Sequence, residues 1–172
     1  MHCCKNCGNN NCCCRPVQRP AAAFGQGMFN GAQGGFEFTV APGDLVLAPG
    51  ANFPSAEITI PLDTFGPMNC VGCARDSLVI QQDGFYEISY YAGVEFGTGV
   101  QAALYVARAG AQIDATWSQW STGGITPTQT VAKTALVRLC AGARLSLVAR
   151  VWTAGETLIV SPRALLSVRR IL

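Results

Sequence analysis

Apolar and polar residues alternate along much of the chain, most clearly in its middle. From residue 86 to residue 96, apolar side chains share one parity and most of the other positions are polar or glycine. The apolar set is Tyr86, Ile88, Tyr90, Ala92, Val94 and Phe96. A period of two is typical of a strand with one buried face. The pattern predicts a long antiparallel strand, preceded by a turn at Gln82-Asp83-Gly84.

The same criterion predicts further strands on both sides of this one. They are expected around Leu104 and Val106, at 113–117, 135–139 and 145–151, at 157–160 and at 166–172. A loop at 108–112 and the turn Ala141-Gly142-Ala143 separate neighbouring strands. No segment shows the helical period. We therefore predict an all-β protein, an antiparallel sandwich or barrel of about eight to ten strands.

Composition divides the chain into three zones. Residues 1–15 are rich in Cys and Asn, residues 16–35 form a spacer of Pro, Ala, Gly and Gln, and the alternating pattern fills residues 36–172. The spacer glycines keep no three-residue period, which argues against collagen, and they follow no predicted strand, which argues against a dinucleotide loop. We expect a connector, a flexible or extended linker and one folded domain.

Charge is scarce in this chain. Charged residues make up 13 % of it and hydrophobic residues 49 %, whereas soluble domains have about 25 % charged residues. Much of the surface must therefore be uncharged or covered, as in a subunit of a larger assembly. The net charge of +2 comes from scattered residues, so we expect neither a nucleic-acid partner nor an anionic membrane partner.

The chain shows no pattern for membrane insertion or export. No stretch approaches the roughly 20 apolar residues that span a bilayer. The opening MHCCKNCGNNNCCC is polar and lacks the apolar run of a Sec signal. We expect a protein that is not exported by the Sec route and does not enter a membrane.

The cysteines suggest covalent crosslinking between molecules. Six of the nine cysteines lie in the first fourteen residues, and adjacent cysteines rarely bridge each other because the geometry is strained. An odd number leaves one thiol per chain without an internal partner. The candidates for intermolecular disulfides are Cys3, Cys4, Cys7, Cys12, Cys13 and Cys14 in the arm, and Cys70, Cys73 and Cys140 in the domain. The arm thiols are expected to reach out, while the domain thiols either receive them on a neighbour or form a local staple.

Metal binding is the alternative interpretation of the same thiols. Cys4 and Cys7, and also Cys70 and Cys73, have the spacing of zinc knuckles. The two pairs are more than sixty residues apart, against about 15 to 20 in compact zinc ribbons. We therefore expect no metal and no other cofactor, and we keep a metal-binding tail as an alternative.

Catalysis has little support in the sequence. The single histidine, His2, lies in the arm, and the ten acidic residues fall mostly in turns or on polar strand faces. No nucleophile elbow, phosphate loop or zinc-protease motif is present. We expect a protein that is not an enzyme. Trp117 and Trp120, three residues apart, are expected to face opposite sides of a strand, one in the core and one at a subunit contact or a ligand.

Four segments, taken in order, resemble a known family. They are SLVIQQDGFYEISYYAGVEFG, QAALYVARAGAQI, TALVRLCAGARLSLVARVW and ALLSVRRIL. Their order and spacing are similar to those of the C-terminal jelly-roll domains of bacterial collagen-like spore-surface glycoproteins, which are relatives in fold of the complement and tumour-necrosis-factor (TNF) heads. The resemblance covers residues 36–172. It implies an antiparallel jelly-roll β-sandwich that forms a homotrimer.

The arm resembles the N-terminal connectors of endospore appendage subunits. That resemblance implies disulfides to neighbouring subunits, formed when a protein made in the mother cell is oxidised as that cell lyses. The expected function is a structural subunit of a fibre on the spore surface, in the exosporium or an appendage. Its expected partners are copies of itself, with other spore-coat or exosporium proteins as further partners. A tip adhesin or anchoring trimer on a fibre made of another protein is the remaining alternative.

Overall fold

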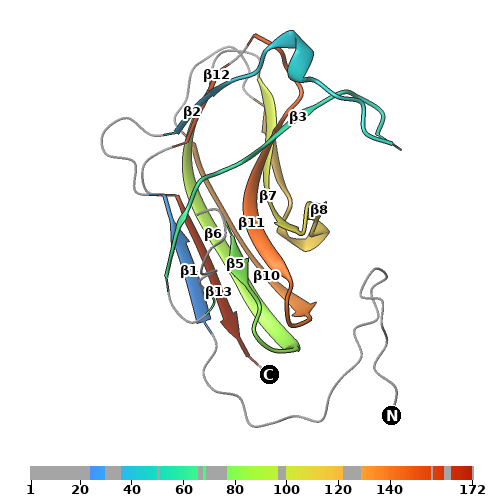
Figure 1. The fold of residues 1–172 in the computed structure, drawn as a ribbon. Helices are drawn as coiled ribbons and strands as arrows, with labels where there is room; N and C mark the ends of the chain where they lie inside the picture. Colours follow the sequence, from blue (N-terminus) through green and yellow to red (C-terminus); the bar gives the residue numbers. More distant parts are fainter. Residues whose placement is uncertain are drawn as a thin grey trace.

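The protein is a sandwich of two antiparallel β-sheets in the computed structural model (Figure 1). The structure describes residues 24–29, 36–49, 51–65, 68, 77–96, 100–121, 129–155, 157–160 and 164–171. Its strands are β1 (Phe24–Met28), β2 (Phe36–Thr39), β3 (Ala56–Thr59), β4 (Asp63–Phe65), β5 (Leu78–Val79), β6 (Gly84–Phe96), β7 (Gln101–Arg108), β8 (Ala111–Gln112), β9 (Ser118–Ser121), β10 (Gln129–Leu139), β11 (Arg144–Val151), β12 (Thr157–Val160) and β13 (Leu165–Arg170). Two short 3₁₀ turns, η1 (Pro42–Asp44) and η2 (Asp114–Thr116), complete the described elements.

The first sheet has β6 at its centre. β10 pairs with one edge of β6 along its length, while β12 and β13 share the other edge, β12 opposite residues 94–96 and β13 opposite residues 86–91. β2 continues the sheet beyond β12, and β1 continues it beyond β13. Strands that share one edge of the same neighbour lie end to end, and we count each such pair as one line of the sheet. The first sheet then has four lines, in the order β1/β2, β13/β12, β6, β10, with β4 added beyond β1.

The second sheet is built in the same way around β11 and β7. β3 and β5 share one edge of β11, β7 pairs with the other edge, and β8 and β9 pair with β7. Numbered along the chain, the eight lines of the two sheets follow the orders 1-8-3-6 and 2-7-4-5. Two four-stranded sheets connected in this way form a jelly roll. The predicted fold class is confirmed.

The core lies between the two sheets. On β6, Tyr86, Ile88, Tyr90, Ala92 and Val94 are buried, and the residues between them are mostly exposed or half-buried. The predicted alternation and the predicted antiparallel pairing of this strand are confirmed. Leu104, Val106, Leu145 and Leu147 face them from the second sheet and are fully buried. Burial of these side chains, at about 25 cal/mol per Å² of apolar surface, is the main force that holds the sheets together.

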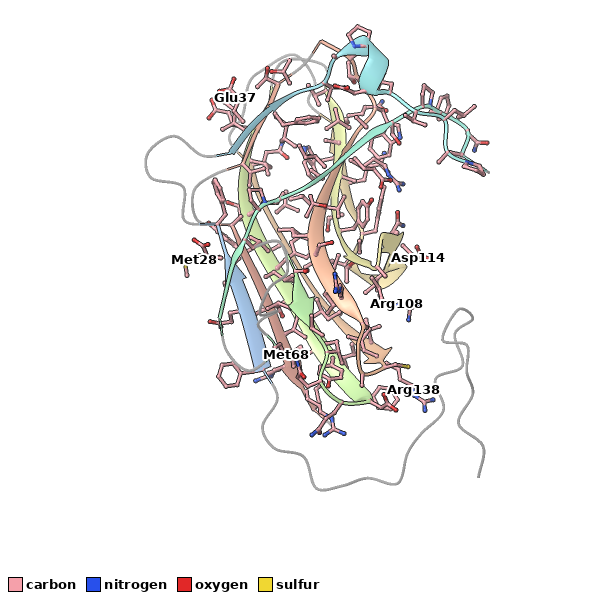
Figure 2. The ribbon with its side chains drawn as sticks, viewed as in Figure 1. Met28, Glu37, Met68, Arg108, Asp114 and Arg138 are labelled. Carbon is pink, nitrogen blue, oxygen red and sulfur yellow. The ribbon has the colours of Figure 1, made fainter. Side chains whose placement is uncertain are left out.

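The predicted start of the domain is wrong. Residues 16–35 were expected to be a spacer, yet Phe24–Met28 forms β1 between β13 and β4. Gly25 and Gly27 face the interior, and a Cβ at Gly25 would lie 2.6 Å from the Met68 Cβ. Gly25 therefore serves close packing in this strand. Figure 2 labels Met68 in the interior near β1. The folded domain includes residues from Phe24, twelve before the predicted boundary at Phe36.

A second correction concerns the strand predicted at 113–117. Residues 114–116 form η2, and the strand begins only at Ser118. The Thr116 Oγ1 donates to the Ile113 carbonyl at 2.7 Å and accepts the Val106 N–H at 2.8 Å. These bonds fold the chain into a tight turn against β7. Alternation of apolar residues alone does not reveal such a side-chain bond.

The predicted turns after β7 and after β10 are confirmed. At Gln82-Asp83-Gly84 the chain bends at the first two residues, and Gly84 already belongs to β6. Ala109 and Gly110 connect β7 and β8 with positive φ at both residues, 49° and 84°, as in a type I′ hairpin turn. Gly142 between β10 and β11 also has a positive φ of 84°. Among the described residues, no helix is long and apolar enough to cross a membrane.

Candidate functional site: an apolar face and a cysteine arm

Large apolar side chains are exposed on the outer surface of the first sheet. On β1, Phe24 and Met28 point outward on either side of Gln26, while Gly25 and Gly27 point inward. Figure 2 shows Met28 outside the sheet, at the end of β1. On the other strands of this sheet, and in the residue that follows β13, exposed large hydrophobics are Phe85, Tyr91, Leu136 and Ile171. We call the outward-facing residues of β1, β13, β6 and β10, together with Ile171, the apolar face.

The register arranges this face in rows across the sheet. Met28 is paired with Leu165, Leu165 with Tyr91, and Tyr91 with Ala132, which makes one apolar row. The next row is polar and consists of Gln26, Ser167, Ser89 and Thr134. Within it the Ser89 and Thr134 hydroxyls are 3.0 Å apart and share a hydrogen bond.

The third row mixes apolar and charged residues. Phe24 is paired with Arg169, Arg169 with Glu87, and Glu87 with Leu136. The Arg169 Nε lies 2.7 Å from a Glu87 carboxylate oxygen. Because these two charges neutralise each other, a partner that covers the row does not bury an unpaired charge. The face therefore combines exposed apolar area with compensated charge, as protein interfaces do.

The outer surface of the second sheet is different, because the chain covers part of it itself. Tyr105 on β7 is 1 % exposed beneath Trp117, with the ring centroids 5.4 Å apart and stacked. Trp152 meets Trp117 edge-on at 5.8 Å. The Arg150 guanidinium carbon lies 5.2 Å from the centroids of both Tyr105 and Trp117, within the range of cation–π attraction. The Arg150 Nε donates to Glu57 at 2.7 Å.

This aromatic cluster changes the acidity of Tyr105. Burial of its hydroxyl raises the pKa of Tyr105 to about 12, and the nearby Glu57 carboxylate acts in the same direction, because both disfavour the phenolate. Arg150 opposes the change only in part. The cluster is thus a small second core on the outside of the sandwich. It was not predicted from the sequence, since Arg150 and Trp152 fall outside any motif.

The two tryptophans face opposite sides, as predicted. Trp120 packs against the main core, while Trp117 packs on the outer cluster. The acidic residues that the structure describes mostly have structural partners. Asp83 accepts the Ala141 N–H at 2.7 Å, and Asp44 accepts the Ala41 N–H at 2.9 Å. Within the described residues, no group of three or more His, Cys, Asp or Glu side chains is placed to hold a metal.

Cys140 lies at the turn between β10 and β11. It is 8 % exposed and takes part in a disulfide, and its partner is a cysteine outside the described residues. The other candidates, Cys3, Cys4, Cys7, Cys12, Cys13, Cys14, Cys70 and Cys73, also lie outside the described residues. The pairing of the thiols and the assignment of 1–15 as a connector stay predictions, and so does the alternative of a zinc site.

The root of the arm and the Cys140 turn lie at the same end of the sandwich. Phe24 is paired with Arg169 at the end of β13, and Leu139 with Gly84 at the start of β6. Arg169 is in turn paired with Glu87, three residues along β6 from Gly84. Figure 1 shows the start of β1, the end of β13 and the β10–β11 turn together at this end. An arm that leaves the domain at Phe24 therefore starts at the same end of the sandwich as the Cys140 turn, with β13 and β6 between the two.

Comparisons with known proteins add likeness of fold only. No protein-family model matches the chain, and no curated protein matches it. Among solved structures, murine APRIL covers 87 % of this chain and 100 % of its own, at 10 % identity and a TM-score of 0.49. The Eiger TNF structure from S. frugiperda covers 87 % of this chain and 93 % of its own, at 13 % identity and a TM-score of 0.45. The jelly roll is established by the strand order of this chain, which does not depend on these similarities.

Proposed function

We propose that this chain is a structural subunit of a fibre on the surface of bacterial endospores, in the exosporium or an appendage. The jelly roll associates with copies of itself as a trimer through the apolar face. The N-terminal arm then joins successive trimers by intermolecular disulfides. The role is mechanical, and no catalytic step is assigned to it.

The observation that carries this proposal is the concentration of exposed apolar side chains on one sheet. Six large hydrophobics of the apolar face are between 40 % and 66 % exposed. Large exposed apolar patches mark interaction sites, whereas single exposed hydrophobics are normal on a monomer. The low charge of the chain agrees with a surface that is covered in an assembly.

The position of the arm supports covalent joining between molecules. The 23 residues before Phe24 span at most about 75 to 80 Å when extended, at about 3.3 Å per residue. That length is shorter than the sequence boundaries implied, because β1 belongs to the domain, but it still exceeds the width of a small domain. Six cysteines near the tip of such an arm can therefore meet a neighbouring subunit.

Electron microscopy and nonreducing electrophoresis of the purified full chain test the proposal. Under oxidising conditions we expect filaments and a ladder of crosslinked species, and both should shorten with a thiol reductant. The matched control replaces the six arm cysteines with serine. This variant should keep the trimer, because noncovalent contacts hold it, and should lose the ladder.

Three outcomes would contradict the proposal. Isolated trimers of the oxidised wild-type chain would favour a tip or anchoring role, and a monomer would remove the trimer as well. Filaments that respond to a chelator and not to a reductant would assign the thiols to a metal.

A further inference from the structure

A second exposed apolar segment projects from the domain. Residues 45–55, LVLAPGANFPS, leave the sandwich after η1 and return to it at β3. Val46 and Ser55 form a β-bridge with two hydrogen bonds of 3.0 Å, and the Ala51 N–H donates to the Ala48 carbonyl at 3.0 Å. These bonds give the described part of the segment a defined hairpin-like shape. We call residues 45–55 the finger. Figure 1 shows it extending from the end of the sandwich opposite to the end of β13.

The finger carries the most exposed phenylalanine among the described residues. Phe53 is 70 % exposed, Val46 64 % and Leu47 60 %. The stretch from Leu45 to Ala56 contains no charged residue. Apolar side chains in contact with water contribute no free energy of burial, and they contribute it only when another surface covers them.

The exposed large hydrophobics of the described residues fall into two groups. Six belong to the apolar face, and the remaining three belong to the finger. The two groups lie on different parts of the molecule, so one copy cannot cover both by a contact between identical patches. A contact between two different patches covers both: made reciprocally by two copies it gives a two-fold dimer, and repeated from copy to copy it gives a heterologous assembly that closes into a ring when the rotation permits. The proposed trimer requires the second arrangement.

We propose that the finger of one copy docks on the apolar face of the next copy of the same chain. This inference rests on the proposed self-association and names the segment that makes the contact. Val46, Leu47 and Phe53 supply the inserted apolar side chains. On the receiving copy, the contact surface consists of the apolar row through Tyr91 and of Leu136, which lies two rows further along β10.

The exposed area is sufficient for such a contact. With roughly 200 Å² per large side chain, six half-exposed residues of the face present on the order of 600 Å². Three residues of the finger, about two-thirds exposed, present on the order of 400 Å² before Ala and Pro side chains are added. A finger of this size covers a similar area of the face, so one contact buries on the order of 800 Å² in total. In a ring each copy makes two such contacts, which together reach the size of a standard interface.

Charge favours a second copy over a lipid surface. The charged residues nearest to the finger in sequence are Asp44 and Glu57, and neither is basic. Segments that insert into anionic membranes have Lys or Arg beside their apolar residues. On the receiving face, Glu87 and Arg169 already form an ion pair. These two charges therefore need no charged partner from the finger, which has none to offer.

The test uses the full chain in thiol reductant, so that only noncovalent contacts are measured. One variant carries V46S, L47S and F53S, and another carries Tyr91→Ser and L136S. All five positions are exposed, so both variants should keep the circular dichroism spectrum of the wild type. Light scattering after size exclusion should give a trimer for the wild type and monomers for each variant, with dissociation constants raised at least about 100-fold.

Mixing the two variants distinguishes this contact from one between identical patches. The finger variant keeps an intact face and the face variant keeps an intact finger, so the mixture should form a one-to-one complex that grows no further. A finger variant that remains trimeric would overturn the inference while leaving the proposed trimer intact. A wild-type monomer would instead refute the proposed function. Wild-type binding to anionic phospholipid vesicles that is lost in the finger variant would assign the finger to a membrane and overturn the inference as well.

Discussion

Replacement of Gly25 by alanine is expected to destabilise the domain. A Cβ at this position would lie 2.6 Å from the Met68 Cβ, 3.1 Å from the Leu78 Cδ2 and 3.2 Å from the Met68 Sδ. The closest of these atoms is fixed to the backbone of residue 68 and cannot rotate away. Overpacking of this kind costs about 1 to 3 kcal/mol. Alanine recovers about 0.5 to 1 kcal/mol of backbone entropy in a strand, so the expected net loss is about 1 to 2 kcal/mol.

Gly43→Ala is the matched control for this change. The new Cβ would meet no atom within 4 Å. With no contact to oppose it, the entropic term alone should stabilise the protein by about 0.4 to 1 kcal/mol. The same substitution is thus expected to have opposite signs at the two glycines.

Guanidinium unfolding of both variants and the wild type, at one protein concentration and in reductant, measures the difference. Tryptophan fluorescence follows the transition, because Trp117 and Trp120 both pack in folded clusters. If Gly25→Ala were as stable as the wild type or more stable, the close packing of β1 on Met68 would be refuted. The assignment of residues 24–28 to the domain would then lose its physical basis.

Three further predictions concern buried groups. Thr116→Val should cost about 1 to 3 kcal/mol by chemical denaturation, because it removes the hydroxyl that accepts the buried Val106 N–H; Thr39→Val, at an exposed hydroxyl pair, should change stability little, and equal losses would refute the argument. Burial raises the pKa of Tyr105 to about 12, so its contribution to stability is complete below pH 10 and is lost as pH rises through 12; a tyrosinate absorbance titration in which Tyr105→Phe removes no late-titrating group would contradict this. Peptide mapping without reduction should join Cys140 to a cysteine of residues 69–76, because β5 holds both flanks of that segment near the β10–β11 turn; a bond to the arm would refute it.

The strands with one buried face were predictable from the sequence. On β6 the buried positions from Tyr86 to Val94 have the predicted parity, apart from the additional buried Gly93, because burial of one face requires a period of two. The turns at Gly110 and Gly142 were also predictable, since a positive φ favours glycine. The sandwich follows from these elements and their antiparallel order.

The errors have physical causes that a local pattern does not contain. The glycines of β1 were interpreted as a linker because their packing partner, Met68, lies forty-three residues away from Gly25 in the sequence. The turn at η2 depends on one hydroxyl, that of Thr116, which bonds to the backbone of another strand. The ion pair of Glu57 with Arg150 joins residues 93 positions apart.

The candidate site was only partly predictable. The crosslinking arm stays a prediction from the cysteine pattern and the resemblance, whereas the apolar face needed the register of four strands. The finger was missed because it does not alternate. Its uncharged run LVLAPGANFPS, between Asp44 and Glu57, was the pattern that marked it.

The pairing of Phe24 with Arg169 has a practical consequence for labelling. The first described strand starts where the last one finishes, so a fluorophore or affinity tag fused after the last strand, or attached directly before Phe24 in place of the arm, sits at the same pole of the sandwich. The opposite pole, from which residues 45–55 project, stays unobstructed. Gold particles bound to such tags would therefore mark the polarity of any filament directly in the microscope.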